Sequence, residues 1–144
     1  MNTMGDIIII EDDADDRQLL MDIFEEIMEE NNYENRLVIV EEASSVLGFL
    51  KGKDADPFII ISDINMPKIN GFDLRNQIFS DPKLREKAIP FIFLTTSGYN
   101  QDYIKQAYSL SIQGYFAKPN NYKEYKKLLA GILSYWKMAK TVEV

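Results

Sequence analysis

Five short runs of apolar residues, mostly β-branched or aromatic, recur along this chain, and a longer segment with helical periodicity follows each of them. Within each run the apolar residues are mostly continuous rather than alternating with polar ones. This pattern is typical of strands that are buried on both faces of a parallel sheet. The expected strands are Ile7–Ile10, Leu37–Val40, Phe58–Ile61, Phe91–Leu94 and Tyr115–Ala117.

The helical segments are clearest near the two ends of the chain, where apolar residues repeat at helical spacing from Leu19 to Met28 and from Tyr125 to Trp136. Weaker helical patterns cover Ala43–Leu50, Phe72–Phe79 and Asp102–Leu110. Five β–α units in this order predict an α/β fold. We expect one doubly wound, five-stranded parallel sheet, with helices on both faces and right-handed crossovers.

Composition narrows the classes of function. The chain has 144 residues, which suits a single domain, and it contains neither Cys nor His. Disulfides, thiolate metal sites and histidine chemistry are therefore excluded. The net charge of −7 argues against nucleic acid as a partner. Since no apolar stretch is long enough for a signal peptide or a membrane span, we expect a cytoplasmic protein without membrane association.

Polar side chains follow four of the five expected strands. Open parallel sheets bind ligands outside the carboxyl ends of their strands, so residues at these positions are candidates for a site. Each has an ordinary explanation by itself, such as the start of a helix for the acidic residues. Their joint placement makes a binding site the stronger interpretation. The residues are Glu11, Asp12 and Asp13, then Asp63, then Thr95 and Thr96, and finally Lys118.

The chemistry of this set is that of a magnesium-assisted phosphoryl acceptor. Carboxylates that lie close together repel one another unless a cation sits among them. Oxygen ligands without His or Cys favour a hard ion, and Mg²⁺ is usually held by one or two carboxylates with waters and phosphate oxygens. A carboxylate beside such an ion can act as a nucleophile toward phosphorus. A Lys and a hydroxyl nearby would then stabilise the phosphoryl oxygens.

The motifs around these positions resemble the receiver domains of response regulators in two-component signalling, of the chemotaxis-protein (CheY-like) type. The resemblance extends over about residues 6–136 and implies the flavodoxin-like strand order 2-1-3-4-5. It rests on four motifs: Ile9-Ile10-Glu11-Asp12-Asp13 with Arg17, Ser62-Asp63-Ile64-Asn65-Met66-Pro67 with Asn70-Gly71, Leu94-Thr95-Thr96, and Gly114-Tyr115-Phe116-Ala117-Lys118-Pro119.

The resemblance also implies a role for individual residues. Asp63 resembles the phosphoacceptor, which becomes an aspartyl phosphate. Glu11 and Asp12 resemble the acidic pair that binds Mg²⁺, with Asp12 as the direct ligand. The remaining positions are the backbone carbonyl of Asn65 as a further metal ligand, Thr95 as the switch hydroxyl, Tyr115 as the switch aromatic and Lys118 as the phosphate-binding lysine.

Partners follow from the same resemblance. A histidine kinase or a histidine phosphotransfer protein would donate the phosphoryl group, as in a phosphorelay. Only 26 residues follow Lys118, so we expect residues 1–144 to be a stand-alone receiver domain without an output domain. The signal would pass to a downstream protein through the surface formed by the fourth helix, fifth strand and fifth helix. A homodimer is left open, and a turnover enzyme acting on external substrates is not expected.

Three positions depart from the pattern of the family. Asn120 stands where the family often has an aromatic residue, and Thr96 is bulkier than the usual small residue. Ser111 lies where family members often have a glycine that ends the fourth helix, so backbone strain is expected at Ser111.

Rival interpretations fit less well. A phosphatase of the haloacid-dehalogenase type would need an Asp-x-Asp-x-Thr/Val motif after the first strand, and the run from Asp13 to Arg17 lacks its last member. A flavodoxin-like FMN carrier needs a phosphate loop where this chain has carboxylates. An adaptor with an inactive receiver fold stays open, although the four residues it could dispense with, Asp12, Asp63, Thr95 and Lys118, are all present.

Overall fold

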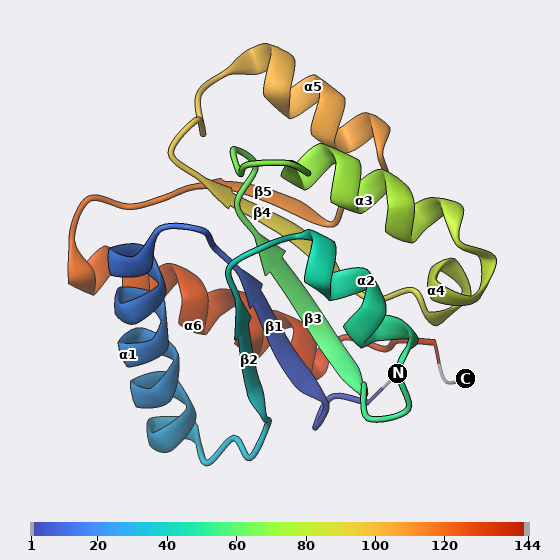
Figure 1. Cartoon of the computed structure of the whole chain (residues 1–144). Coiled ribbons are helices and arrows are strands. Elements are labelled where there is room, and N and C mark those ends of the chain that lie inside the picture. Colours follow the sequence, from blue (N-terminus) through green and yellow to red (C-terminus); the bar gives the residue numbers. More distant parts are fainter. Residues whose placement is uncertain (1, 143–144) are drawn as a thin grey trace.

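The computed structural model of the chain describes residues 2–142, which form one parallel sheet with helices on both faces (Figure 1). The strand order is β2-β1-β3-β4-β5, and all neighbouring strands are parallel. Both the expected fold class and the expected strand order are confirmed. The strands are β1 (Asp6–Ile10), β2 (Leu37–Val40), β3 (Pro57–Ser62), β4 (Phe91–Thr95) and β5 (Gly114–Ala117).

Five of the helices in the described part of the chain lie where helical periodicity predicts them. The short helix α4 was not predicted. Asp81 caps its first turn by accepting hydrogen bonds from the backbone amides of Lys83 and Leu84, at 3.0 and 3.2 Å, and Pro82 occupies its first position. The helices are α1 (Ala14–Asn31), α2 (Ser44–Lys51), α3 (Gly71–Ser80), α4 (Pro82–Lys87), α5 (Gln101–Ser109) and α6 (Tyr122–Met138).

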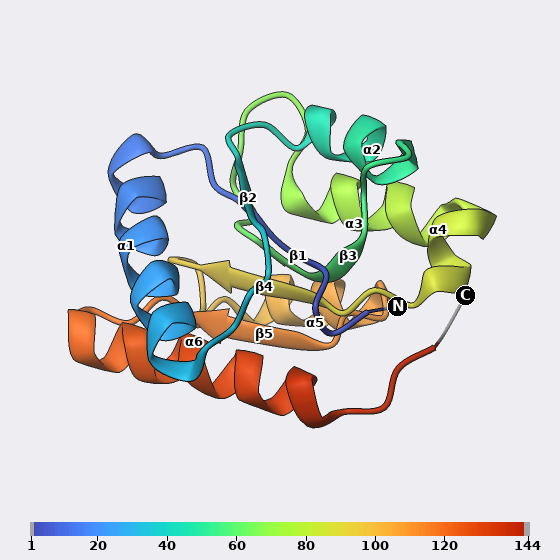
Figure 2. The same ribbon diagram turned by 90° about the horizontal axis from the view of Figure 1, so that it is seen from below.

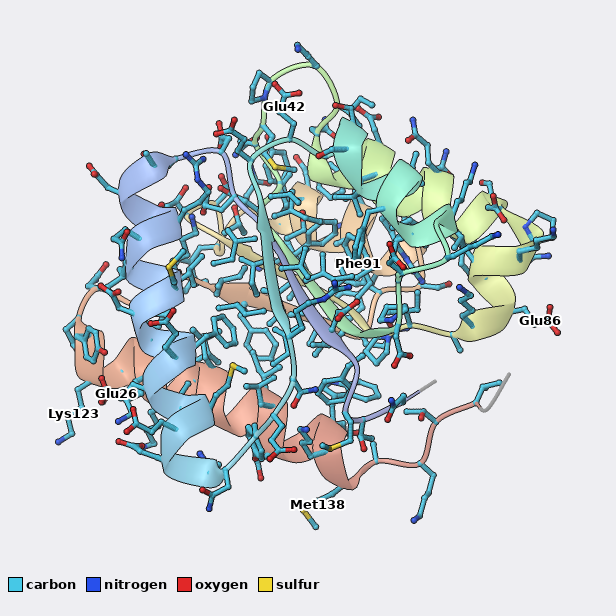
Figure 3. All side chains as sticks on the ribbon, turned by 60° about the horizontal axis from the view of Figure 1, so that its bottom comes forward. Glu26, Glu42, Glu86, Phe91, Lys123 and Met138 are labelled. Carbon is cyan, nitrogen blue, oxygen red and sulfur yellow. The ribbon has the colours of Figure 1, made fainter. Side chains whose placement is uncertain are left out.

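Alternate residues of the strands pack into two separate cores, except at the irregular start of β3, where Phe58 and Ile59 belong to the same core. Ile7 and Ile9 of β1 pack with α1 and α6, whereas Ile8 and Ile10 pack with the helices of the opposite face. Figure 2 shows α1 and α6 on one side of the sheet, and α2 and α3 on the other. Phe91 lies in the interior, while Lys123 projects outward (Figure 3). Burial of the strands on both faces accounts for their continuous apolar sequences.

The far end of α5 is tied to α3 by a buried arginine. The guanidinium of Arg75 donates hydrogen bonds to the carbonyls of Leu110, at 2.9 Å, and Ser111, at 2.8 Å. Burial lowers the pKa of Arg75, and the guanidinium also lies over the ring of Phe91. Ser111 has a φ of 59°, in the left-handed region, so the strain expected at this position is confirmed.

None of the described helices is long and apolar enough to span a membrane.

Candidate functional site

A cluster of acidic side chains lies at the carboxyl ends of β1 and β3. Glu11 and Asp12 follow β1 directly, and Asp63 follows β3, whose last residue lies beside Ile10 in the sheet. One carboxylate oxygen from each of these three residues lies within 4.8 Å of the others. The structure thus brings together the three acidic residues that the sequence nominates.

Lys118, which follows β5, reaches across to this cluster. Its ammonium group forms ion pairs with Glu11, with Asp16 at 3.0 Å and with Asp63 at 3.4 Å, and its side chain is only 8% exposed. Asp16 lies in the first turn of α1, where Asp13 is the N-cap. The sequence gives no signal that a residue of this first turn also binds a lysine after the last strand.

The charges of the cluster are incompletely balanced. Burial raises the pKa of Glu11 to about 7, against the opposing hydrogen bond from Lys118, and the charge of Asp63 raises it further. Burial lowers the pKa of Lys118, but the carboxylates of Glu11, Asp63 and Asp16 outweigh it, so this pKa lies above its ordinary value. A second cation in the cluster would stabilise the ionised form of Glu11.

Asp63 is held by the backbone and remains accessible. Its amide donates to the carbonyl of Ile10 at 3.0 Å, and its Oδ1 accepts a hydrogen bond from the amide of Ile64 at 2.7 Å. The side chain is 11% exposed. Behind it, Gly71 starts α3 so close that an added Cβ would contact the Asp63 carbonyl and lie 2.8 Å from Phe93. Glycine at this position therefore lets the loop after β3 pack tightly.

The two expected switch residues meet at Ser97. Thr95 is fully buried at the end of β4, and its Oγ1 accepts a hydrogen bond from the amide of Ser97 at 3.2 Å. The hydroxyl of Tyr115 donates to the carbonyl of Ser97 at 2.9 Å, and its ring packs edge-on against Phe93. Burial, followed by the neighbouring Tyr103 and Asp63, raises the pKa of Tyr115.

The side chain of Asn65 joins the same loop to helix α5. Its amide nitrogen donates to the hydroxyl of Ser97 at 3.1 Å, and its amide oxygen accepts from the hydroxyl of Tyr103 at 3.2 Å. Sequence reasoning assigned only the backbone carbonyl of Asn65 and gave Ser97 no role at all. The departing positions Thr96 and Asn120 are both exposed near this edge of the sheet.

The residues present fit a hard divalent cation. Each of Glu11, Asp12 and Asp63 offers a carboxylate oxygen, and the raised pKa of Glu11 reflects a buried anion without enough positive charge. Mg²⁺ is the biological cation that prefers such an all-oxygen set with open positions for water and phosphate.

Comparisons with known proteins agree with this geometry. A family model described as the response regulator receiver domain matches residues 7–130. The response regulator Rcp1 of Synechocystis sp. is 30% identical over 135 residues, which are 90% of this chain and 87% of that protein.

Solved structures give the same result. The phosphorylated cyanobacterial phytochrome response regulator RcpA has a TM-score of 0.82 at 26% identity, over 96% of this chain and 98% of that one. The Mn²⁺-bound form of Rcp1 has a TM-score of 0.79 at 28% identity, over 96% and 99% of the two chains.

Proposed function

This chain belongs to the response regulator receiver domain family of two-component signalling, whose members act as phosphorylation-dependent switches, and we propose that it accepts a phosphoryl group on Asp63 beside a bound Mg²⁺. The observation that carries this assignment is the convergence of Lys118 on Asp63 within the acidic cluster of Glu11 and Asp12. We take residues 6–136 as the core of one receiver domain.

In the proposed transfer, a carboxylate oxygen of Asp63 forms a bond to the phosphorus of a phosphohistidine on a histidine kinase or histidine phosphotransfer protein. The P–N bond breaks, and its electron pair leaves with the imidazole, which takes up a proton. The ammonium of Lys118, already 3.4 Å from Asp63, would contact the new phosphoryl oxygens.

For the metal, we assign Asp12 and Asp63 as direct ligands, Glu11 as a ligand through water, and the backbone carbonyl of Asn65 as a further ligand. When bound, Mg²⁺ would neutralise charge that develops on the phosphoryl oxygens. Support comes from the all-oxygen cluster and from the Mn²⁺-bound form of the related Rcp1.

The proposed switch uses Thr95 and Tyr115. Phosphorylation adds a charge of about −1.5 to −2, and Thr95 would donate a hydrogen bond to it. Moving a two-state equilibrium from 1:99 to 99:1 takes roughly 5.5 kcal/mol of differential interaction. A hydrogen bond to a charged group contributes about 1.5–3 kcal/mol, so Thr95 alone is too weak for a complete switch. Either the Lys118 contact contributes as well, or the shift is partial.

The proposed output surface is formed by α5, β5 and α6, which correspond to the fourth helix, fifth strand and fifth helix of the family because α4 is additional here. Tyr99, which is 90% exposed, lies two residues before the start of α5. A groove of about 940 Å³ between β5 and α6 is lined by Tyr99, Phe116 and Trp136 among others. Exposed aromatic area of this kind suits a downstream protein partner.

The test of the acceptor chemistry is intact-mass spectrometry after incubation with phosphoramidate, a small phosphoryl donor. We expect the mass of one phosphoryl group to be added in the presence of Mg²⁺, and far less to be added when the metal is removed by a chelator. Equal labelling with and without Mg²⁺, or no labelling in either case, would contradict the proposed function.

The metal assignment predicts unequal effects of two neighbouring substitutions. Asp12→Ala removes a proposed direct ligand, so it should weaken Mg²⁺ binding strongly in a calorimetric titration. Asp15→Ala removes an exposed charge nearby, in the first turn of α1, and should change the affinity little. If both variants lose the same affinity, Asp12 acts only through the general negative potential.

A further inference from the structure

Ser97 is the meeting point of four hydrogen bonds at the rim of the site, and it accepts one of them through its carbonyl from the amide of Asn100, the N-cap of α5, at 3.1 Å. Its amide donates to Thr95 Oγ1, its hydroxyl accepts from the side-chain amide of Asn65, and its carbonyl accepts from Tyr115. A displacement of the Thr95 hydroxyl therefore acts on Tyr115 and also on the loop from Asp63 to Asn70, which we call the acceptor loop. The second of these two routes continues through Asn65 to the hydroxyl of Tyr103 on α5.

Tyr103 has two separable contacts with the rest of the domain. Its ring packs edge-on against Phe72 of α3, with the ring centres 5.3 Å apart, and belongs to the edge of the hydrophobic core. Its hydroxyl extends beyond that core to Asn65, two residues after the acceptor Asp63. The ring contact with Phe72 does not involve Asn65, whereas the hydroxyl bond requires the side chain of Asn65 to face α5.

We propose that the side chains of Tyr103, Asn65 and Ser97 form a latch that holds α5 against the acceptor loop in the unphosphorylated protein, and that phosphorylation of Asp63 works against it. This regulatory role rests on the function proposed above for Asp63. The latch makes Tyr103 a positioning residue, because its hydroxyl acts on Asp63 only through Asn65.

The physical reason is the displacement of Thr95 Oγ1. A Thr95 hydroxyl that turns to donate to a phosphoryl oxygen moves Oγ1, which now accepts from the Ser97 amide at 3.2 Å. Ser97 then shifts or loses that bond, and its hydroxyl is drawn away from Asn65. Because one residue makes all four of these hydrogen bonds, a displacement of Ser97 weakens its bonds to Asn65 and Tyr115 together.

The test is amide hydrogen exchange and NMR of α5 in the Tyr103→Phe variant, measured without any phosphoryl donor. The change removes one hydroxyl and keeps the ring on Phe72. We expect exchange in the first turns of α5 to rise about two- to tenfold, the factor that corresponds to one net hydrogen bond. The NMR signals of this segment should also move toward their positions in the parent bound to beryllofluoride, which stands in for the phosphoryl group. Tyr108→Phe is the matched control, since Tyr108 lies on the same helix and is 53% exposed.

A second variant keeps the test decisive. Ser97→Ala removes the hydroxyl that Asn65 contacts and should loosen the same turns of α5. Resting exchange equal to the parent in both Tyr103→Phe and Ser97→Ala overturns the latch. Failure of the parent to gain a phosphoryl group from phosphoramidate would instead overturn the role of Asp63, and the exchange experiment, which needs no donor, would still report on the resting bond.

Discussion

Replacement of Asp63 by asparagine is expected to abolish the gain of phosphoryl mass from phosphoramidate while leaving the fold intact. Asparagine has the size of aspartate but presents a neutral amide, which is a far weaker nucleophile toward phosphorus. The amide oxygen can still accept the hydrogen bond that Ile64 donates to Asp63 Oδ1. Loss of the charge removes both a repulsion from Glu11 and an attraction to Lys118, so the stability of the variant should stay close to that of the parent.

The control is Asp15→Asn, which removes the same charge from an exposed position in the first turn of α1. This variant should label like the parent. Labelling of Asp63→Asn at the parental level would place the acceptor on another carboxylate, and mass analysis of peptides would identify whether Asp12 or Glu11 carries the group.

Lys118→Ala is expected to give the largest loss of stability among substitutions in the site. The lysine is 8% exposed and contacts three carboxylates, so its removal leaves the buried Glu11 without its cation. Breaking such a buried pair typically costs about 3 kcal/mol or more in the free energy of unfolding. The measurement is urea unfolding followed by circular dichroism in the presence of a chelator. Labelling of Asp63 should fall as well.

Lys126→Ala is the matched control. Lys126 also contacts two carboxylates, Glu26 at 2.5 Å and Glu30 at 2.7 Å, but these partners are 44% and 54% exposed. Water replaces the lost contacts there, so stability should change little. Equal losses in the two lysine variants would show that burial of the Lys118 cluster has no energetic weight. Added Mg²⁺ should restore part of the stability of Lys118→Ala only.

The pH dependence of Lys118→Ala follows from Glu11. In the parent, burial raises the pKa of Glu11 from 4.5 to about 7, and loss of the lysine removes an interaction that lowers it. The folded variant therefore holds this proton more tightly than the unfolded chain does. Its stability should fall as the pH rises from 4.5 through 7, so the difference from the parent grows in that direction.

The sheet could be predicted from the sequence nearly residue for residue, because strands buried on both faces must be continuously apolar. The expected run Leu37–Val40 and the observed β2 have the same bounds. The left-handed backbone at Ser111 was also predictable, since Ser111 stands where receiver domains often have the glycine that ends a helix. Helix α4 escaped prediction because six residues are too few to establish a periodicity.

The candidate site was predictable only as far as strand ends determine it. The positions of Glu11, Asp12, Asp63 and Lys118 follow from the order of the strands in the sheet. The ion pair between Lys118 and Asp16, and the contact of Asn65 with Tyr103, depend on the paths of loops and on side-chain rotamers. Neither property has a periodic signature in the sequence.

The carbonyl contacts of Arg75 have a mechanical consequence for α5. This helix has nine residues and is about 14 Å long, and the arginine fixes the backbone just beyond its last turn. Any rearrangement of α5 is therefore a pivot about that fixed point, with displacements that increase toward Asn100. A partner that binds near Tyr99 would contact the end of α5 that moves most, and one that binds near Leu110 would contact the end that moves least.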